Sequence, residues 1–244
     1  MNAMQRYAEN LRAILERAFT EQKDVMEEIA RRMCACVTGG HMVYLFGTGH
    51  AHILAEEMFY RAGGLAAVRP ILDDRLMLHV SASGSTQAER EPGCAARLLA
   101  ETDMGAGDML IVCSNSGRNA APVELALLAR EKGVCVVALT NLAHSRSCAP
   151  RNPEGLRLFE AAEFVLDNCG AIGDASVDAG LPYRVGATST AVGAALLEAI
   201  ECRCVELAVE QGLPIDVFSS SNVDAGDEIN EKIIARYQSR IPML

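Results

Sequence analysis

The chain has 244 residues, of which half are apolar and 22% are charged, so it can bury a substantial core and differs from a disordered protein. Its formal net charge of −10 argues against a nucleic-acid binder, because phosphate backbones attract a basic face. No apolar run approaches the roughly 20 residues that a membrane span needs. The first residues also lack the basic and then apolar pattern of a signal peptide. We therefore expect a cytoplasmic protein that binds neither nucleic acid nor a membrane.

The nine cysteines predict ordinary reduced and mostly buried thiols, as is usual for a chain of the reducing cytosol. Cys34 and Cys36 are separated by one residue, whereas zinc-binding pairs are separated by two or more. His50 and His52 could share a metal ion, but no third ligand follows at a suitable spacing. We expect neither a metal nor a cofactor.

The amino-terminal part of the chain, residues 3–38, is predicted to be helical, as one long helix or two short ones. Its apolar residues lie three, four or seven positions apart with charges between them, and Gly39-Gly40 ends the pattern. The next elements are expected in this order: a buried strand over 42–46, a helix over about 51–61, a strand over 66–72, a loop over 81–86, and a helix over 87–101 that is interrupted near Pro92.

Two continuous apolar runs, 109–113 and 134–139, are typical of strands buried on both faces of a parallel sheet. The other elements of this half are a helix over 120–132, a loop over 145–155, a short strand over 163–166, irregular chain over 170–184, a helix over 187–211, a polar tail over 219–227 and a helix ending near Arg240. The alternation of strands and helices predicts an α/β protein with a doubly wound parallel sheet. We divide it into an extension (1–38), a central domain (39–213) and a carboxyl-terminal tail and helix (214–244).

Three predicted loops place glycine, serine or threonine directly before a helix. They are Gly47-Thr48-Gly49-His50, Ser114-Asn115-Ser116-Gly117 and Gly186-Ala187-Thr188-Ser189-Thr190. Right-handed crossovers put such strand-end loops on one edge of the sheet, so we expect the three to converge. Hydroxyl groups, backbone N–H groups and the positive ends of helix dipoles together bind an anion such as a phosphate. The loops therefore predict an oxyanion site.

Four segments carry a family resemblance: Phe46-Gly-Thr-Gly-His50, Cys113-Ser-Asn-Ser-Gly117, Ala138-Leu-Thr-Asn141 and Gly186-Ala-Thr-Ser-Thr190. On these segments, over roughly residues 40 to 212, the chain resembles the sugar isomerase (SIS) family, and within it uncharacterised phosphoheptose-isomerase-like proteins. The resemblance implies a five-stranded parallel sheet flanked by helices, a homodimer or homotetramer, and a sugar phosphate held by serine and threonine loops. His50 departs from the family pattern, which has serine or another small residue there.

By position, the resemblance implies that Ser114, Ser116, Thr188 and Thr190 contact phosphate, with Gly117 and Asn119 shaping the loop. The full set expected around the phosphate is Gly47, Thr48, Gly49, His50, Ser114, Asn115, Ser116, Gly117, Asn119, Thr188, Ser189 and Thr190. Any single serine here could instead be a helix N-cap, which is a common structural role.

An aldose–ketose isomerase needs a base that moves a proton between neighbouring carbons. Related enzymes use a glutamate, often with a histidine for ring opening, and place an acidic residue on the helix before the central strand. Glu89 occupies that position, and we expect it to be catalytic. Glu57, or its neighbour Glu56, lies on the helix after the first glycine loop and is a second candidate. His52, in the first turn of that helix, is the candidate proton relay, and the alternative is a solvated or capping role for each.

Two polar segments, 167–174 and 219–230, are dense in groups that hydrogen-bond hydroxyls. Long loops of this kind are often functional. We expect them to fold over the sugar, from the same chain or from a neighbouring subunit. The contacts would come from Asn168, Asp174, Asn222 and Asp224. The alternative is turn chemistry together with an N-cap at Asp227.

The leading hypothesis is an enzyme that isomerises a phosphorylated sugar through an enediol. One alternative is a non-catalytic phosphosugar sensor or regulator, which needs the same loops but no base. Another is an etherase or lyase of amino-sugar phosphates, because Glu89–Leu99 is similar to the corresponding region of N-acetylmuramic acid 6-phosphate etherases. A dinucleotide enzyme is a third reading, since Asp73 follows Gly47-x-Gly49 at a fitting distance, but His52 stands where the third glycine belongs.

Overall fold

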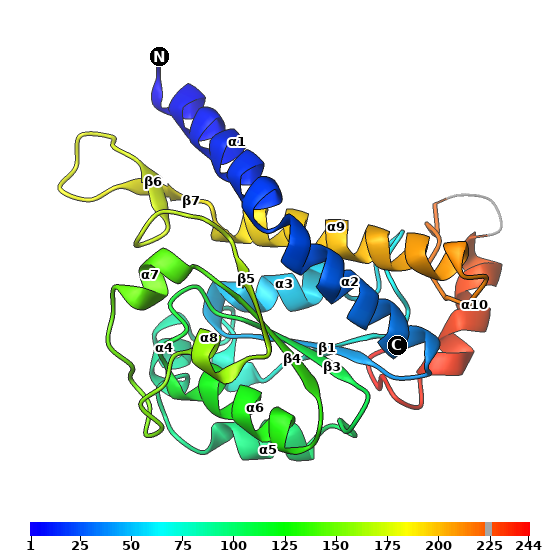
Figure 1. Cartoon of the computed structure of the whole chain (residues 1–244). Helices are drawn as coiled ribbons and strands as arrows, with labels where there is room; N and C mark the ends of the chain where they lie inside the picture. Colours follow the sequence, from blue (N-terminus) through cyan, green and yellow to red (C-terminus); the bar gives the residue numbers. More distant parts are fainter. Residues whose placement is uncertain (223–225) are drawn as a thin grey trace.

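The computed structural model describes residues 1–222 and 226–244, and its centre is one parallel sheet. All neighbouring strands of this sheet run parallel, in the order β2-β1-β3-β4-β5 (Figure 1). The strands are β1 (Val43–Gly47), β2 (Val68–Ile71), β3 (Met109–Cys113), β4 (Cys135–Thr140) and β5 (Phe164–Asp167). The predicted α/β fold with a five-stranded parallel sheet is confirmed.

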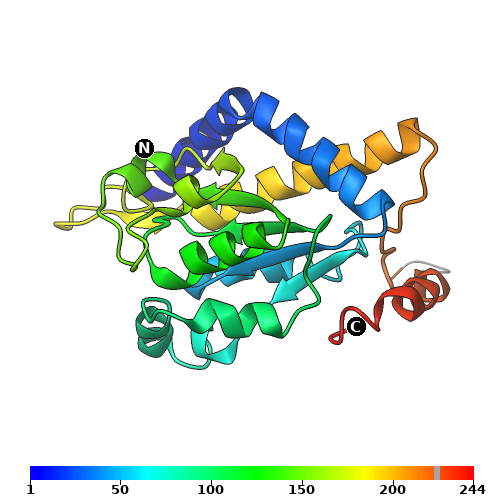
Figure 2. The ribbon, with the colours of Figure 1, turned by 60° about the horizontal axis from the view of Figure 1, so that its bottom comes forward.

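Side chains of each strand alternate between two hydrophobic cores, one on either face of the sheet. Val43 and Leu45 belong to the core beneath one helical layer, whereas Tyr44 and Phe46 belong to the core on the opposite face. The first layer contains α1 (Ala3–Glu21), α2 (Lys23–Thr38), α3 (His52–Glu57) and α9 (Ser189–Glu210). The second contains α5 (Cys94–Ala100), α6 (Ala120–Glu131) and α8 (Leu158–Ala161). Figure 2 shows the two layers on either side of the sheet.

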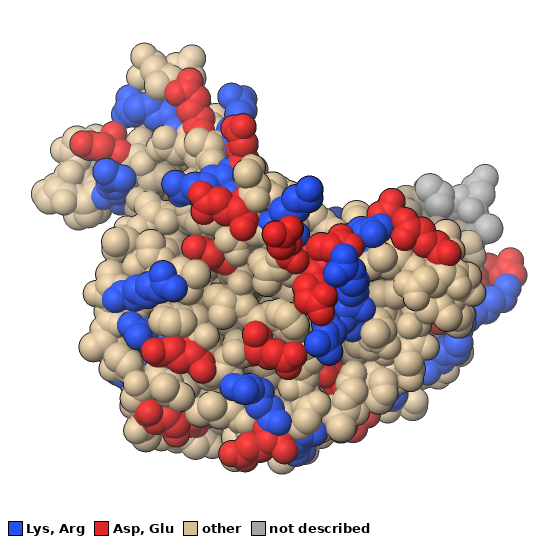
Figure 3. All heavy atoms as spheres, in the orientation of Figure 1, with Lys and Arg blue, Asp and Glu red and all other residues tan. Residues whose placement is uncertain are grey.

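The amino-terminal segment forms two helices, which answers the question that the periodicity left open. Asn2 and Gln5 begin α1 with a capping box, in which each side chain accepts a hydrogen bond from the other residue's backbone N–H. Acidic and basic side chains are mixed along α1 and α2 (Figure 3). One of their ion pairs, between Glu27 and Arg203 at 3.0 Å, ties α2 to α9.

An antiparallel hairpin of β6 (Ala175–Val177) and β7 (Val185–Ala187) lies against α1. The prediction of irregular chain over 170–184 is wrong at β6, because a three-residue strand is too short to show an alternating pattern. Asn10 and Tyr7 of α1 donate hydrogen bonds of 2.9 and 2.8 Å to carbonyl groups of the hairpin. The hairpin and the first half of α1 project together from the rest of the molecule (Figure 1).

Several short helices were missed or misjudged by the sequence pattern. The predicted loop over 81–86 belongs to α4 (Ala82–Ala88), where the Ser81 hydroxyl accepts a hydrogen bond from the Gly84 N–H at 3.1 Å. The predicted helix over 51–61 is shorter, since α3 ends at Glu57. The remaining short helices are η1 (Gly49–Ala51), η2 (Asp74–Leu76) and α7 (Leu142–Arg146), the last of which ends inside the predicted loop over 145–155.

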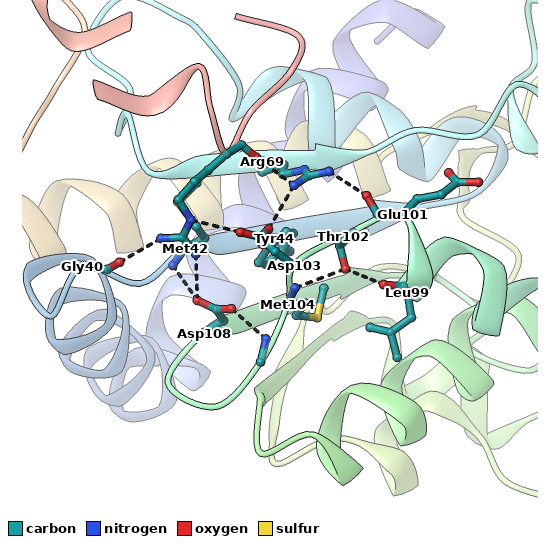
Figure 4. Close-up of polar contacts among 12 residues, drawn as sticks. Gly40, Met42, Tyr44, Arg69, Leu99, Glu101, Thr102, Asp103, Met104 and Asp108 are labelled. Carbon is teal, nitrogen blue, oxygen red and sulfur yellow. Dashed lines mark hydrogen bonds and ion pairs between the residues drawn. The ribbon is translucent and has the colours of Figure 1, made fainter. Parts of the chain in front are cut away.

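The carboxyl-terminal helix α10 (Gly226–Tyr237) leads to a segment that closes the amino edge of the sheet. Asp103 accepts hydrogen bonds from Tyr44 (2.6 Å), Arg69 (3.1 Å) and Arg240 (3.2 Å). Asp108 accepts from the backbone N–H groups of Met42 and Gly105, each at 2.9 Å. Figure 4 shows this network. Over the described ranges, none of the helices combines the length and the apolar character required to cross a membrane.

Candidate functional site

A cavity of about 300 Å³ opens at the carboxyl edge of the sheet, above β1 and β3. Strand β2 lies on one side of β1, and β3 lies on its other side, so the direction in which successive strands are added reverses at β1. Open α/β sheets bind ligands at such a reversal of strand order. The cavity is lined by Thr48, His50, Ala51, Leu54, Glu89, Cys113, Ser114, Asn115, Ser116, Leu139, His144, Asn168, Asp174, Ser189 and Thr190. This lining, within the part of the chain that the structure describes, contains no lysine or arginine.

The loop from Ser114 to Gly117 is rigidly held at the end of β3. Ser114 donates its N–H to the Leu139 carbonyl (3.0 Å) and its hydroxyl accepts the Gly117 N–H (3.2 Å). Gly117 has φ +56°, and a Cβ there would lie 3.0 Å from the Leu158 side chain, so any other residue would strain the loop. The N–H groups of Asn115 and Ser116 have no acceptor within the described residues. This loop therefore offers unengaged donors to the cavity.

Glu89 lies between the loops that follow β1 and β3. Its two carboxylate oxygens accept hydrogen bonds from the Thr48 hydroxyl (2.5 Å) and the Asn119 amide (2.6 Å). Its carbonyl also accepts the Ala121 N–H at 3.1 Å, which anchors the end of α4 to the start of α6. Thr48 and Asn119 are both buried, so the carboxylate is held in one orientation at the wall of the cavity.

The far wall of the cavity carries a second carboxylate, that of Asp174. One oxygen accepts the N–H groups of Thr188 (3.1 Å) and Ser189 (2.8 Å), and the other accepts the Ser189 hydroxyl (2.6 Å). These groups form the amino end of α9, where we expected phosphate contacts. The structure places an internal anion on them, which the sequence pattern gave no means of foreseeing.

Three asparagine side chains join the loops that follow β3, β4 and β5. Asn168 donates to the Asn115 side chain at 2.8 Å and accepts from Asn141 at 3.0 Å. Asn168 also accepts the Gly170 N–H at 3.0 Å. Asn168 is buried yet lines the cavity, so this network fixes the floor between the serine loop and the far wall.

His144 lines the cavity, although the sequence analysis did not select it. It lies in α7, whose first turn is capped by Asn141 through a 2.8 Å hydrogen bond to the His144 N–H. Its Nδ1 accepts the Gly173 N–H at 3.0 Å, which assigns the ring proton of the neutral form to Nε2. An asparagine cap directly after a buried strand was the signal that could have found it.

The other predicted catalytic residues lie outside the cavity lining. His52 is buried, and its Nδ1 faces the Gly49 carbonyl while Nε2 lies 3.7 Å from Glu56. His52 therefore holds the loop that contains Gly49 in place. Glu57 forms an ion pair with Arg61.

The remaining predicted contacts divide between supporting and distant positions. Gly47, Gly49, Gly117, Asn119 and Thr188 do not line the cavity but belong to the loops that form it. A Cβ at Gly47 would collide with the Ala51 backbone, so this glycine allows η1 to turn back over β1. Asn222 is exposed outside the lining, and Asp224 falls outside the described residues.

Cys113 is the thiol of the cavity lining. Complete burial raises its pKa to about 12, so the sulfur stays protonated near neutral pH and is a poor nucleophile. Among residues 1–222 and 226–244, no group of three or more His, Cys, Asp and Glu side chains has a geometry that could hold a metal ion.

Comparison with protein families agrees with this geometry. Residues 6–141 match the model of the SIS domain, and the chain belongs to the SIS-domain family. Within it, the chain stands with the UPF0309 proteins. The relative from Listeria innocua is 40% identical over 232 residues, 95% of this chain and 94% of the relative. One from Geobacillus kaustophilus is 37% identical over 98% of this chain and 95% of its own length.

Solved structures share the fold at low sequence identity. Phosphoheptose isomerase GmhA from Neisseria gonorrhoeae superposes with a TM-score of 0.53 and 20% identity, over 82% of this chain and 95% of that one. The NanR protein of Vibrio vulnificus, complexed with ManNAc-6P, gives a TM-score of 0.52 and 18% identity, over 100% of this chain and 70% of that one. The fold is therefore common to isomerases and to at least one protein captured with a sugar phosphate.

Proposed function

We propose that the chain binds a sugar phosphate and interconverts its aldose and ketose forms. The observation that carries this proposal is one cavity that holds both the Ser114–Gly117 loop and the clamped carboxylate of Glu89. A phosphate site and a base in the same cavity are what this reaction requires. The similarity in fold to phosphoheptose isomerase supports the choice of reaction.

The phosphate is bound by neutral groups. The Ser114 and Ser116 hydroxyls and the free N–H groups of Asn115 and Ser116 donate to its oxygens, and the positive end of α6 adds a favourable field. These contacts are the same in the substrate and in the transition state, so they supply binding and leave the rate to other groups.

Glu89 removes the proton from C2 of the open-chain aldose and returns it to C1, through an enediol. Thr48 and Asn119 hold the carboxylate in place during both transfers. Because its Nδ1 is already engaged by the Gly173 N–H, His144 acts through Nε2. It donates the Nε2 proton to O1 as C2 is deprotonated, and the same nitrogen takes up the proton of the C2 hydroxyl as C1 is protonated and the ketose carbonyl forms. A positioned base of this kind contributes about 10²- to 10⁴-fold to the rate.

The test is exchange of the C2 proton with solvent deuterium, followed by NMR across pentose, hexose and heptose phosphates. Thermal shift on the same panel reports binding. Glu89→Gln should keep binding and lose about 10²- to 10⁴-fold in exchange. Glu91→Gln, at an exposed position two residues away, is the matched control and should exchange like the wild type.

A phosphosugar sensor is the second candidate, and the hydrogen bonds already made by Glu89 favour it. Both oxygens of this carboxylate already accept a hydrogen bond, which is also what a purely structural residue would do. The NanR fold neighbour was captured with ManNAc-6P. Binding of a sugar phosphate without any C2 exchange in the wild type would select the sensor. Release of lactate from an amino-sugar phosphate would instead select an etherase.

We also propose that the chain assembles as a homodimer or homotetramer. The projecting arm of α1 and the hairpin exposes large apolar side chains, including Met4 (77% exposed), Tyr183 (68%) and Leu181 (51%). Apolar side chains gathered on one projection are typical of an association surface. Light scattering after size-exclusion chromatography measures the mass, and a monomer at micromolar concentration would exclude the proposal.

A further inference from the structure

The amino end of α9 is an anion seat that the chain fills with its own carboxylate. A helix of 22 residues directs unpaired N–H groups and partial positive charge toward whatever lies before its first turn. Asp174 occupies that place with three hydrogen bonds of 2.6 to 3.1 Å, two of them from backbone N–H groups. An external phosphate would accept hydrogen bonds from the same groups.

The seat keeps one further polar atom without a partner. Thr188, the N-cap residue of α9, is 1% exposed, and its hydroxyl oxygen has no hydrogen-bond partner among the described residues. The geometry is thus that of an oxyanion receptor that a smaller internal anion occupies.

Asp174 is fixed in this position from both sides. It has φ +67°, and its own N–H donates to the Ala171 carbonyl at 2.9 Å. The preceding Gly173 N–H is bound to His144, and the following Ala175 pairs with Ala187 in the hairpin. Moving the carboxylate out of the cavity would therefore disrupt several contacts at once.

The permanently charged side chains of the cavity lining are all negative. Its lining includes the carboxylates of Glu89 and Asp174, and the residues that could carry a positive charge there are His50 and His144. A phosphate on the serine loop meets neutral donors. A second anionic group on the same ligand, reaching the far wall, would meet the carboxylate of Asp174 with no arginine or lysine to balance it.

We infer that Asp174 is a specificity residue that restricts the cavity to sugars with a single anionic group, and that it excludes sugar bisphosphates and sugar acids. This inference rests on the proposed binding of a sugar phosphate. It adds that the end of the ligand opposite the phosphate is uncharged and bears hydroxyl groups, which the Asp174 carboxylate, Ser189 and Asn168 can hydrogen-bond.

The experiment compares fructose 6-phosphate, fructose 1,6-bisphosphate and inorganic phosphate by isothermal titration calorimetry. Asp174→Asn keeps the shape of the cap without its charge, whereas Asp174→Gly suits the positive φ and empties the seat. Asp178→Asn is the matched control, since Asp178 lies on the same hairpin, is exposed and caps a turn at Gly180. Circular dichroism verifies that each variant is folded.

The wild type and Asp178→Asn should bind the bisphosphate at least about tenfold more weakly than the monophosphate. Asp174→Asn should reduce that ratio severalfold, and Asp174→Gly should also bind one more inorganic phosphate per chain than the wild type. An unchanged ratio in both Asp174 variants, or a wild type that binds both sugars equally, would overturn the inference. If neither sugar binds the wild type, the proposed function fails. The number of inorganic phosphates bound by Asp174→Gly still tests the inference in that case. One more phosphate per chain than in the wild type supports the role of Asp174 as an internal anion, and no additional phosphate overturns it.

Discussion

The two edges of the same sheet differ in how completely their polar side chains are hydrogen-bonded. At the amino edge, charged side chains saturate one another: Asp103 accepts from Tyr44, Arg69 and Arg240 (Figure 4). At the carboxyl edge, the polar groups are mostly neutral, and several lack partners. Among the described residues, the buried unpartnered side-chain atoms near this edge are Arg118 Nε, Asn119 Oδ1, Ser145 Oγ and Thr188 Oγ1.

The contrast separates polar groups that stabilise the fold from polar groups that are kept for a ligand. A buried polar atom without a partner costs about 1–3 kcal/mol, so a fold that needs only stability removes such atoms. The amino edge follows this rule. The carboxyl edge departs from it in the loops around the cavity, which is where a ligand or ordered water would complete the missing hydrogen bonds.

The largest effect on stability is expected at Asp108, on the amino edge. Asp108→Ala removes the acceptor of the buried Met42 N–H and of the half-buried Gly105 N–H, so the free energy of unfolding should fall by about 2–4 kcal/mol. Urea unfolding measures this loss. Ligand binding at the opposite edge should remain within twofold of the wild type, and a large loss of affinity would show that the two edges are not independent.

Glu201 is a buried carboxyl that lies away from both edges of the sheet, and it tests whether such a group needs hydrogen-bond partners. One of its oxygens accepts the Leu65 N–H, and the other has no partner among residues 1–222 and 226–244. Burial raises the pKa of this carboxyl to about 7. The folded state therefore favours the protonated form, and the free energy of unfolding should decrease as the pH rises from about 4.5 to about 7. The loss is of the order of 2–3 kcal/mol.

Glu201→Gln should abolish this part of the pH dependence, because its amide does not ionise. Urea unfolding at pH 5 and pH 8 measures the difference. Glu131→Gln, an exposed residue at the end of α6, should keep the wild-type dependence. A Glu201→Gln variant that still loses stability between these pH values would contradict the raised pKa.

Gly117→Ala tests the rigidity of the serine loop. The added Cβ would lie 3.0 Å from Leu158 at a positive φ, so the loop must shift, at a cost of about 1–2 kcal/mol. Sugar-phosphate binding should weaken more than stability does, because the N–H groups of Asn115 and Ser116 move with the loop. Gly155→Ala, also at positive φ but with open space around it, is the control for backbone strain alone.

The smallest effect is expected for Tyr7→Phe. This change removes the 2.8 Å hydrogen bond from Tyr7 to the Ala187 carbonyl, worth about 1 kcal/mol at a partly exposed site. Hydrogen exchange of the hairpin amides should accelerate while exchange in β3 and β4 stays unchanged. Equal acceleration throughout the sheet would mean that the hairpin does not open separately.

The sheet was predictable because its strands are continuous apolar runs, such as 109–113, whose burial on both faces leaves a strong pattern. The serine loop was predictable for the same reason, because it directly follows one of those strands. Glu89 was selected only through the family resemblance, since related enzymes place an acidic residue on the helix before the central strand. Asp174 and His144 were not assigned their contacts, because their partners are backbone groups 14 to 29 positions away in the chain. Periodicity carries no information about such contacts. The Glu57–Arg61 ion pair, by contrast, has the i, i+4 spacing of neighbours on a helix, which the sequence does show.

The arm formed by α1 and the hairpin makes the far wall of the cavity a composite of distant parts of the chain. Arg6, Tyr7 and Asn10 reach across 166 to 180 sequence positions to hold the backbone on which Asp174 is mounted. The cap of α9 is therefore braced by the first helix. Deleting the first two turns of α1 would leave every loop residue of the cavity in the sequence and still remove the brace of one wall.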